Sequence, residues 1–279
     1  MNAAPAAVSV PRLATRRVWI GLLLAAVGIG AVFYAPAFAL LVEAIAIGAL
    51  WELGKLAESK GVGLEFTVAA LAVSAYIGLT FFGRIGRFEG DLLSVTVVAA
   101  LATATFLERG NQLMRSAFTL LGVLYIGKLI SYFVAIRALP DLGIPLTIMV
   151  IVIIALTDIG AMVVGTTLGR TPLSPISPRK TVEGAFGGLI VASLAGIGFT
   201  IALHWPWWEG ASIGFVTSLA AQAGDLIESA LKRDAKVKDA GSAIGGHGGV
   251  LDRFDSYLFG GIAFYFSLFM FHVTPAAFP

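Results

Sequence analysis

The sequence predicts an all-α, polytopic membrane protein, and three observations carry this prediction. Hydrophobic residues make up 58% of the chain and charged residues only 13%, whereas soluble domains carry about 25% charged residues. The mean hydropathy is +0.90. The apolar runs are long and continuous instead of alternating with a period of two, and this pattern favours membrane helices over the strands of a β-barrel.

We expect about nine transmembrane helices, at residues 18–33, 37–51, 66–83, 92–106, 117–137, 144–168, 185–204, 211–228 and 256–273. Several are near the lower limit, since a helix needs ~20 residues to cross a hydrocarbon core of about 30 Å. The first two could also be one long tilted helix interrupted at Pro36, and the segment that begins at Arg16 could also be a secretory signal peptide. No repeat or linker divides the chain, so residues 1–279 are expected to form a single integral-membrane domain.

The distribution of lysine and arginine predicts the orientation. If the N-terminus lies inside, most of the 19 basic residues fall in inside segments, and the outside loops hold Arg84, Arg87 and Arg137. This asymmetry is the positive-inside signal. It predicts that residues 170–184 and 229–255 face the cytoplasm, at a bacterial inner or plasma membrane. The net charge of +2 gives no reason to expect nucleic acid, and the absence of cysteine excludes disulfides and thiolate metal sites.

Two aspartates, Asp158 and Asp225, lie inside otherwise apolar spans. A carboxylate at the bilayer centre costs roughly 2.5–3.5 kcal/mol on insertion scales, so such residues usually face a polar cavity and mark function. Each could instead be a packing carboxylate that is hydrogen-bonded to a neighbouring hydroxyl group. On a helix, Asp225 shares one face with Ser229, Lys232 and Lys236. This column has the polarity that a bound metal and phosphate groups above it require.

A glycine-rich run at residues 245–249 surrounds His247. Backbone N–H groups of such a run can approach a phosphate closely, and His247 is either a donor to that phosphate or a plain loop residue. Asp252 and Asp255 follow at a spacing that places them on one helical face, on either side of Arg253. They predict a metal site, or alternatively the acidic cap of a helix N-terminus.

The segment at residues 177–184 combines hydroxyl groups with cationic side chains, which are the groups that bind phosphate. Alternatively, Ser177 could cap a helix that begins at Pro178.

Together these segments resemble the phosphatidate cytidylyltransferase family, also called CDP-diacylglycerol synthases. The C-terminal signature of that family runs from S-x-hydrophobic-K-R through K-D to H-G-G and D-R-x-D. The matching residues are Ser229, Leu231, Lys232, Arg233, Lys238, Asp239, Gly241, Ile244, Gly245, His247, Gly248, Gly249, Asp252, Arg253 and Asp255. Gly245 stands where the family commonly has proline. Residues 158–183 are similar to the upstream segment of the family, and Trp51 and Glu52 fit its N-terminal region.

The resemblance implies transfer of a cytidylyl group from CTP to phosphatidate, which gives CDP-diacylglycerol and pyrophosphate. It implies Mg²⁺ at Asp225 and Asp252, and it leaves room for a second cation. It implies catalytic roles for Lys232, Arg233, Lys238, Asp239, His247, Arg253 and Asp255. It implies substrate contacts by Asp158, Ser177, Lys180, Thr181, Glu183, Ser229, Gly248 and Gly249. A homodimer in the bilayer is also compatible with the family.

Two other functions would use the same features. An ion-coupled transporter also combines intramembrane acids with abundant glycine, although here the charges concentrate at one face and no repeat is visible. A related CTP-dependent transferase could act on another lipid phosphate or on a polyprenol.

Overall fold

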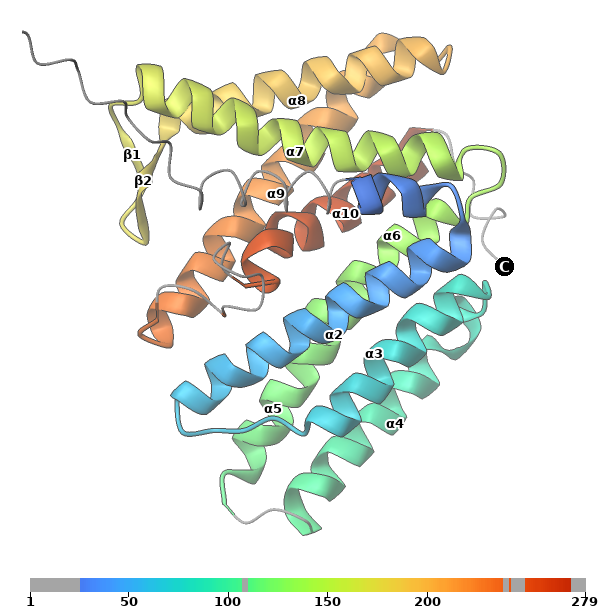
Figure 1. The fold of residues 1–279 in the computed structure, drawn as a ribbon, viewed down its shortest axis with the longest axis vertical. Coiled ribbons are helices and arrows are strands. Elements are labelled where there is room, and N and C mark those ends of the chain that lie inside the picture. Colours follow the sequence, from blue (N-terminus) through green and yellow to red (C-terminus); the bar gives the residue numbers. More distant parts are fainter. Residues whose placement is uncertain (1–25, 107–109, 238–240, 242–248, 272–279) are drawn as a thin grey trace, which may run out of the picture.

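The computed structural model describes residues 26–106, 110–237, 241 and 249–271. Most of these residues are helical, and the strands among them form one short antiparallel hairpin. Helical residues 26–32 precede the first labelled helix. The elements that follow (Figure 1) are α2 (Ala35–Ser59), α3 (Phe66–Phe81), α4 (Ile85–Phe106), α5 (Gln112–Gly122), the π-helix η1 (Val123–Lys128), α6 (Leu129–Arg137), α7 (Gly143–Leu168), β1 (Pro172–Ser174), β2 (Ser177–Thr181), α8 (Val182–Ala202), α9 (Trp207–Asp234) and α10 (Leu251–Phe271).

Six helical stretches in the described part of the chain are long and apolar enough to cross a membrane. They are Ala35–Ser59, Ile85–Phe106, Gln112–Arg137, Gly143–Leu168, Val182–Ala202 and Leu251–Phe271. α3 is apolar but has only 16 residues, and the 28-residue α9 is richer in polar residues. The predicted all-α membrane protein is therefore confirmed, whereas the number of about nine spans stays a prediction.

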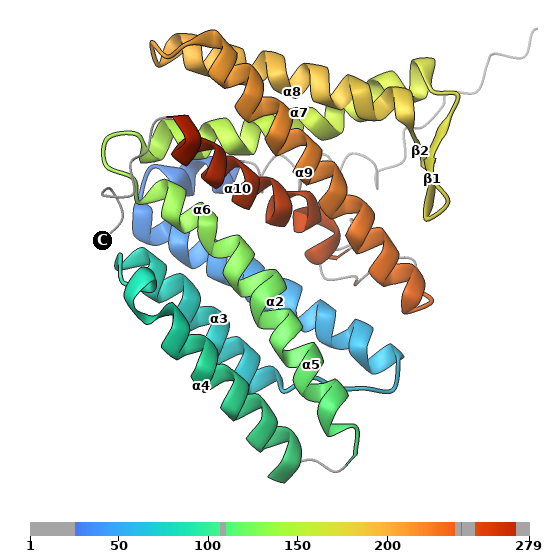
Figure 2. The ribbon, with the colours of Figure 1, turned by 180° about the vertical axis from the view of Figure 1, so that it is seen from behind.

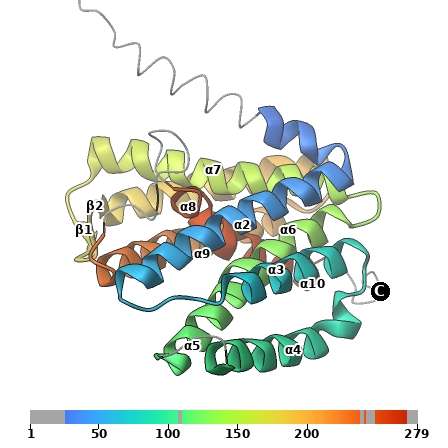
Figure 3. The same cartoon turned by 60° about the horizontal axis from the view of Figure 1, so that its bottom comes forward.

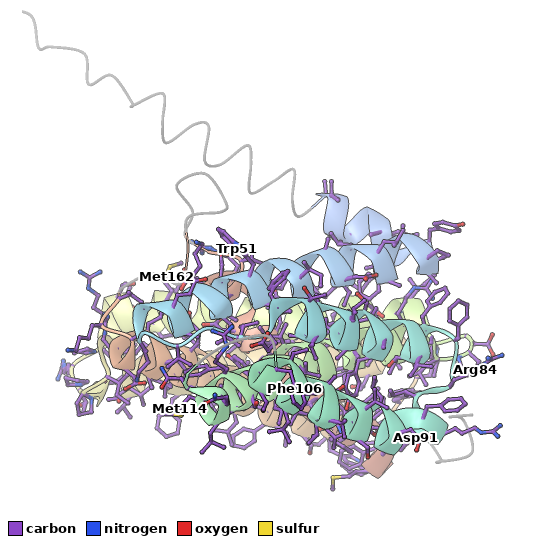
Figure 4. All side chains as sticks on the ribbon, turned by 90° about the horizontal axis from the view of Figure 1, so that it is seen from below. Trp51, Arg84, Asp91, Phe106, Met114 and Met162 are labelled. Carbon is purple, nitrogen blue, oxygen red and sulfur yellow. The ribbon has the colours of Figure 1, made fainter. Side chains whose placement is uncertain are left out.

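The outer surface of the helices is apolar over large areas. Phe106 is 83% exposed and Met114 is 53% exposed, and Trp51 and Met162 are exposed as well; all four are labelled in Figure 4. A soluble monomer rarely exposes contiguous apolar surface of this kind. Contact with lipid removes it from water.

The helices are arranged as two groups, the α7–α8 pair and the N-terminal helices α2 to α6, with α9 and α10 between them. α7 and α8 lie side by side along one edge, and the β1–β2 hairpin projects from the end of this pair (Figures 1 and 2). α4 lies at the opposite edge from α7 (Figure 3). α9 packs against α8 and α10, and α10 in turn contacts α6 and α2. α9 and α10 therefore connect the α7–α8 pair to the N-terminal helices.

Glycine allows α8 and α9 to touch backbone to backbone. A Cβ atom at Gly196 or Gly210 would overlap the backbone of the other residue, and a Cβ at Gly214 would overlap the backbone of Ala192. Small residues at such contacts hold membrane helices together, because the hydrophobic effect does not act between helices in lipid. This close packing fixes α9, which carries several of the predicted site residues.

The helix boundary near Pro36 differs from one of the two expected arrangements. A turn at residues 33–34 separates helical residues 26–32 from α2. Pro36 lies in the first turn of α2, where its missing N–H group removes no helical hydrogen bond. The two segments are therefore separate helices and not one long interrupted helix.

Two further local predictions are wrong. α9 ends at Asp234, and Lys236 adopts a left-handed conformation with a φ of 56°, so Lys236 does not continue the helical column that begins at Asp225. Ser177 lies in β2 and caps no helix. Thr181 caps α8 instead, because its side chain accepts the N–H group of Gly184.

Candidate active site

Most of the predicted site residues lie where α7, β2, α9 and α10 come together. Asp158 lies in α7, Ser177, Lys180 and Thr181 in β2, Glu183 in the first turn of α8, Asp225, Ser229, Lys232 and Arg233 in α9, Gly249 just before α10, and Asp252, Arg253 and Asp255 near the start of α10. Lys238, Asp239, His247 and Gly248 lie outside the described residues.

Three carboxylates form a first charged group, the acidic cluster: Asp158, Asp225 and Asp255. The ammonium group of Lys180 makes an ion pair with Asp225 and interacts electrostatically with the other two carboxylates. Asp255 is buried, whereas the side chains of Lys180 and Asp225 are 30% and 31% exposed. Three carboxylates around one ammonium leave negative charge that is not compensated within the cluster.

Gly224 allows the two members of this cluster that lie on α9 and α10, Asp225 and Asp255, to come close together. A Cβ atom at Gly224 would lie 2.7 Å from the backbone oxygen of Asp255 and 2.9 Å from the ring of Phe259. α9 and α10 therefore approach each other closely at this point, one residue before Asp225.

Two polar side chains near Lys180 fix the ends of the hairpin that carries it. Glu183 Oε2 accepts the backbone N–H groups of Arg170 at 3.1 Å and of Thr171 at 3.2 Å, and it thereby ties the start of α8 to the end of α7. Thr181 Oγ1 accepts the N–H group of Gly184 at 3.1 Å. Within the described residues, Thr181 and Glu183 thus act on the geometry of the hairpin, and their predicted contacts with substrate stay predictions.

A second charged group, the lysine cluster, consists of Glu228, Lys232 and Asp252. Lys232 Nζ donates to Asp252 Oδ1 at 2.6 Å and makes an ion pair with Glu228. Asp252 Oδ2 accepts the N–H group of Gly249 at 2.8 Å, and because Gly249 lies before α10, this bond caps none of the N–H groups of the helix. Glu228 is fully buried, and the side chains of Lys232 and Asp252 are 14% and 10% exposed. This cluster is therefore far less accessible than Lys180 and Asp225.

The two clusters lie on successive turns of two antiparallel helices. Asp252 and Asp255 share a face of α10, as their spacing predicts, but each joins a different cluster. The reason is that α9 presents Glu228 to Asp252 and Asp225 to Asp255. The pair Asp225 and Asp252, predicted to bind metal together, is thus divided between adjacent clusters.

The remaining described residues of the signature lie around these clusters. Ser229 is half-buried on α9. Arg233 is exposed, and its Nη1 atom donates to the backbone oxygen of Val237 at 3.4 Å, which closes the turn after α9. Arg253 is exposed in the first turn of α10.

Sequence reasoning gave no site role to two buried carboxylates beside the signature, Glu228 and Glu52, although Glu52 was noted for its fit to the N-terminal region of the family. Glu228 lies three residues after Asp225, at the end of the expected span 211–228. Glu52 Oε2 accepts the N–H group of Leu251 at 2.8 Å across 199 residues of sequence. Glu52 is one of three glutamates in the apolar helix α2, and an acid within an apolar helix was the signal that could have identified it.

The carboxylates of both clusters suit Mg²⁺ in kind, since this ion prefers oxygen ligands from carboxylates and phosphates. Among the described residues, no group of three or more acidic or histidine side chains is arranged to hold a metal ion. Asp225 and Asp252 each pair with a lysine instead. The donor chemistry therefore fits a divalent cation, and the metal assignment stays a prediction.

A cavity of about 770 Å³ lies elsewhere, between α3, α4, α6 and α10. Its lining includes Tyr76, the ion pair of Glu89 and Lys128, and Tyr265. None of the predicted site residues lines this cavity. The candidate active site is therefore defined by the two charged clusters and not by this cavity.

The fold and the clusters define an integral-membrane protein with paired lysines and carboxylates at the ends of α9 and α10. Residues 14–271 match the model of the cytidylyltransferase family, and the chain belongs to this family of nucleotidyltransferases. It is 36% identical to the phosphatidate cytidylyltransferase of Bacillus subtilis, over 84% of this chain and 89% of the relative. It is 35% identical to the phosphatidate cytidylyltransferase of Synechocystis, over 71% of this chain and 90% of the relative. The predicted family is confirmed.

Proposed function

We propose that this protein transfers a cytidylyl group from CTP to phosphatidate and releases pyrophosphate. The family match and the names of the relatives support this activity. The relative of Helicobacter pylori, 33% identical over 76% of both chains, carries the same name.

One observation in the structure carries the proposal: two lysine–carboxylate pairs lie on adjacent turns, Lys180 with Asp225 and Lys232 with Asp252. Two phosphate-bearing substrates repel each other, so a site that joins them needs cationic groups close together. A phosphate that replaces the carboxylate as partner of either lysine also frees that carboxylate. The same two pairs thus offer cations for the phosphates and oxygen ligands for a metal.

The reaction needs little acid–base chemistry. An anionic phosphate oxygen of phosphatidate attacks the α-phosphorus of CTP and forms a new P–O bond. The bond between the α-phosphorus and the bridging oxygen breaks, and pyrophosphate leaves with the electron pair. Because the nucleophile is already charged, catalysis rests on positioning and on charge neutralisation. Lys180, Lys232, Arg233 and Arg253 are the described side chains that supply positive charge.

We assign Asp225 and Asp252 to hold Mg²⁺. When bound, the ion would neutralise phosphate charge and orient the triphosphate. The acidic cluster carries more negative than positive charge, so it would also attract a second cation. In this assignment Asp158 and Asp255 support Asp225, and Glu228 supports Asp252.

The site faces the cytoplasm in the orientation that the basic residues favour. Asp225 lies nine residues before the end of α9, which corresponds to about 14 Å along the helix axis at 1.5 Å per residue. A phosphate headgroup can reach that depth while its acyl chains stay in the bilayer. Phosphatidate would then enter laterally between helices, and CTP would enter from the aqueous side.

The test measures pyrophosphate release by the purified protein with CTP, Mg²⁺ and phosphatidate, with each component omitted in turn. We expect release only when all three are present, with CDP-diacylglycerol as the lipid product. Release with another lipid phosphate but not with phosphatidate would change the acceptor and keep the mechanism. No release with any lipid phosphate, together with substrate uptake into liposomes, would replace the proposal with a transporter.

A further inference from the structure

Glu52 is a buried carboxylate that the proposed chemistry does not use. It lies in α2, far from the signature in sequence, and it is fully buried. A buried carboxylate is costly unless it is hydrogen-bonded or paired, so its contacts indicate what it does. All of the contacts described below are with the signature region.

The first contact is with the start of α10. Glu52 Oε2 accepts the N–H group of Leu251, the first residue of that helix, at 2.8 Å. The first N–H groups of a helix have no partner within the helix, and a carboxylate there also interacts favourably with the helix dipole. Glu52 thus caps α10 from another helix, which leaves Asp252 to bind Gly249 and Lys232.

The second contact is with two glycines of the signature. A Cβ atom at Gly241 would lie 2.6 Å from Glu52 Cδ, and a Cβ at Gly249 would lie 2.7 Å from the same atom. The left-handed glycines among the described residues are Gly61, Gly83 and Gly110, so positive φ does not explain glycine at 241 or 249. The space that the carboxylate of Glu52 occupies explains it.

The neighbouring residues of α2 hold the same region. A Cβ atom at Gly48, one turn before Glu52, would lie 3.2 Å from the side chain of Val250. At the C-terminal end of α2, Lys60 makes an ion pair with Asp234, the last residue of α9. α2 therefore contacts both the end of α9 and the start of α10, with Glu52 at the second point.

We propose that Glu52 is a positioning residue of the active site: its carboxylate fixes the start of α10 against α2 and thereby holds Asp252 at Lys232. This inference rests on the proposed function for its activity readout. This positioning role requires an acceptor oxygen at the end of a side chain as long as that of glutamate. It does not require direct contact with substrate.

The test compares Glu52→Ala with Glu52→Gln. The alanine variant should lower kcat by roughly 10–100-fold with little change in KM, because small displacements of reacting groups are costly. The glutamine variant should keep kcat within about 5-fold of the wild type, because its amide oxygen still accepts the Leu251 N–H group. Glu43→Gln is the matched control, since Glu43 lies on the same helix but accepts Ser74 Oγ at 2.6 Å.

A double-mutant cycle tests the contact itself. Gly241→Ala should lower activity in the wild type, because the new Cβ meets Glu52, and it should lower activity much less in the Glu52→Ala background. Additive effects would overturn the proposal. Should Glu52→Ala fail to fold, Glu52→Asp takes its place in the cycle, because its shorter side chain withdraws the carboxylate from Gly241.

Hydrogen exchange gives a readout that does not depend on the substrate. The Leu251 amide should exchange faster in Glu52→Ala than in the wild type or in Glu43→Gln. Unchanged exchange together with wild-type kcat would overturn the proposal. If the wild-type protein used another lipid phosphate, the proposed function would fail, but the exchange rates and the ratios of variant to wild-type activity on that acceptor would still test Glu52.

Discussion

The two charged clusters contain the same kinds of group and differ in how they are held. In the acidic cluster, Lys180 reaches Asp225 from a hairpin, and both side chains are about 30% exposed. In the lysine cluster, Lys232 lies between Glu228 and Asp252, all on α9 and α10, and these side chains are nearly or fully buried. One lysine is carried by a short surface element and the other by the packed helices.

This difference predicts different roles. An exposed ion pair contributes little to stability, because solvent screens it, so Lys180 is available to exchange its partner for a phosphate. A buried pair is costly to break, because the remaining charge stays buried, so Lys232 also holds α9 and α10 together. Both clusters are assigned to binding, and the buried one in addition preorganises the site.

Lys232→Met should give the largest effect and would test this comparison most directly. It leaves Glu228 and Asp252 without their cation while it keeps the length of the side chain, and we expect a loss of about 3–5 kcal/mol in the free energy of unfolding. Unfolding in detergent, followed by circular dichroism, measures the loss. Arg233→Met, at the exposed neighbouring position, is the control and should stay within about 0.5 kcal/mol of the wild type. Equal stability of the two variants would show that the lysine cluster is hydrated.

Asp225→Asn should leave a folded protein with turnover lowered by at least ~10²-fold, because the site loses a carboxylate that is assigned to hold the divalent cation, and with it the cation that neutralises the phosphates. Steady-state pyrophosphate release measures the decrease. Asp91→Asn is the matched control, because Asp91 is an exposed aspartate on α4 (Figure 4). Near-normal turnover in a well-folded Asp225→Asn protein would remove Asp225 from the site.

Lys180→Ala should raise the KM for CTP or for phosphatidate by about 10-fold, as the loss of one charge-assisted phosphate contact predicts. Its free energy of unfolding should change by no more than about 1 kcal/mol, because the pair with Asp225 is partly exposed. Separate titrations of the two substrates identify which phosphate Lys180 binds. Lys180→Arg keeps the charge and is the control. Unchanged kinetics in Lys180→Ala would reduce the hairpin to a structural element.

The class of fold could be predicted because hydropathy reports directly on the solvent around a helix. The ends of elements could not be predicted as well. Lys236 fits the helical pattern of α9, but the helix ends at Asp234 and Lys236 is left-handed. The strands of the hairpin have three and five residues, which is too few for a period of two to be recognised.

The site could be predicted where its residues are close in sequence or belong to one signature. The ion pair between Lys180 and Asp225 joins two segments that were each predicted to bind phosphate. Glu52 was not predicted as a site residue, because its contact with Leu251 spans 199 residues and depends on how α2 packs against α10. A helical pattern shows which face of α2 is apolar, but it does not show which helix that face meets.

Thr181→Ala should give the smallest effect and would sharpen the role of the hairpin. Thr181 is the N-cap of α8 and accepts the Gly184 N–H group at 3.1 Å, so its loss should cost about 1 kcal/mol in the free energy of unfolding. Ser177→Ala in the same strand is the control, since Ser177 caps no helix, and its stability should not change. Because Thr181 is the residue after Lys180, a small increase in KM should accompany the lost cap. A KM increase larger than that of Lys180→Ala would show instead that the hydroxyl group of Thr181 binds substrate itself.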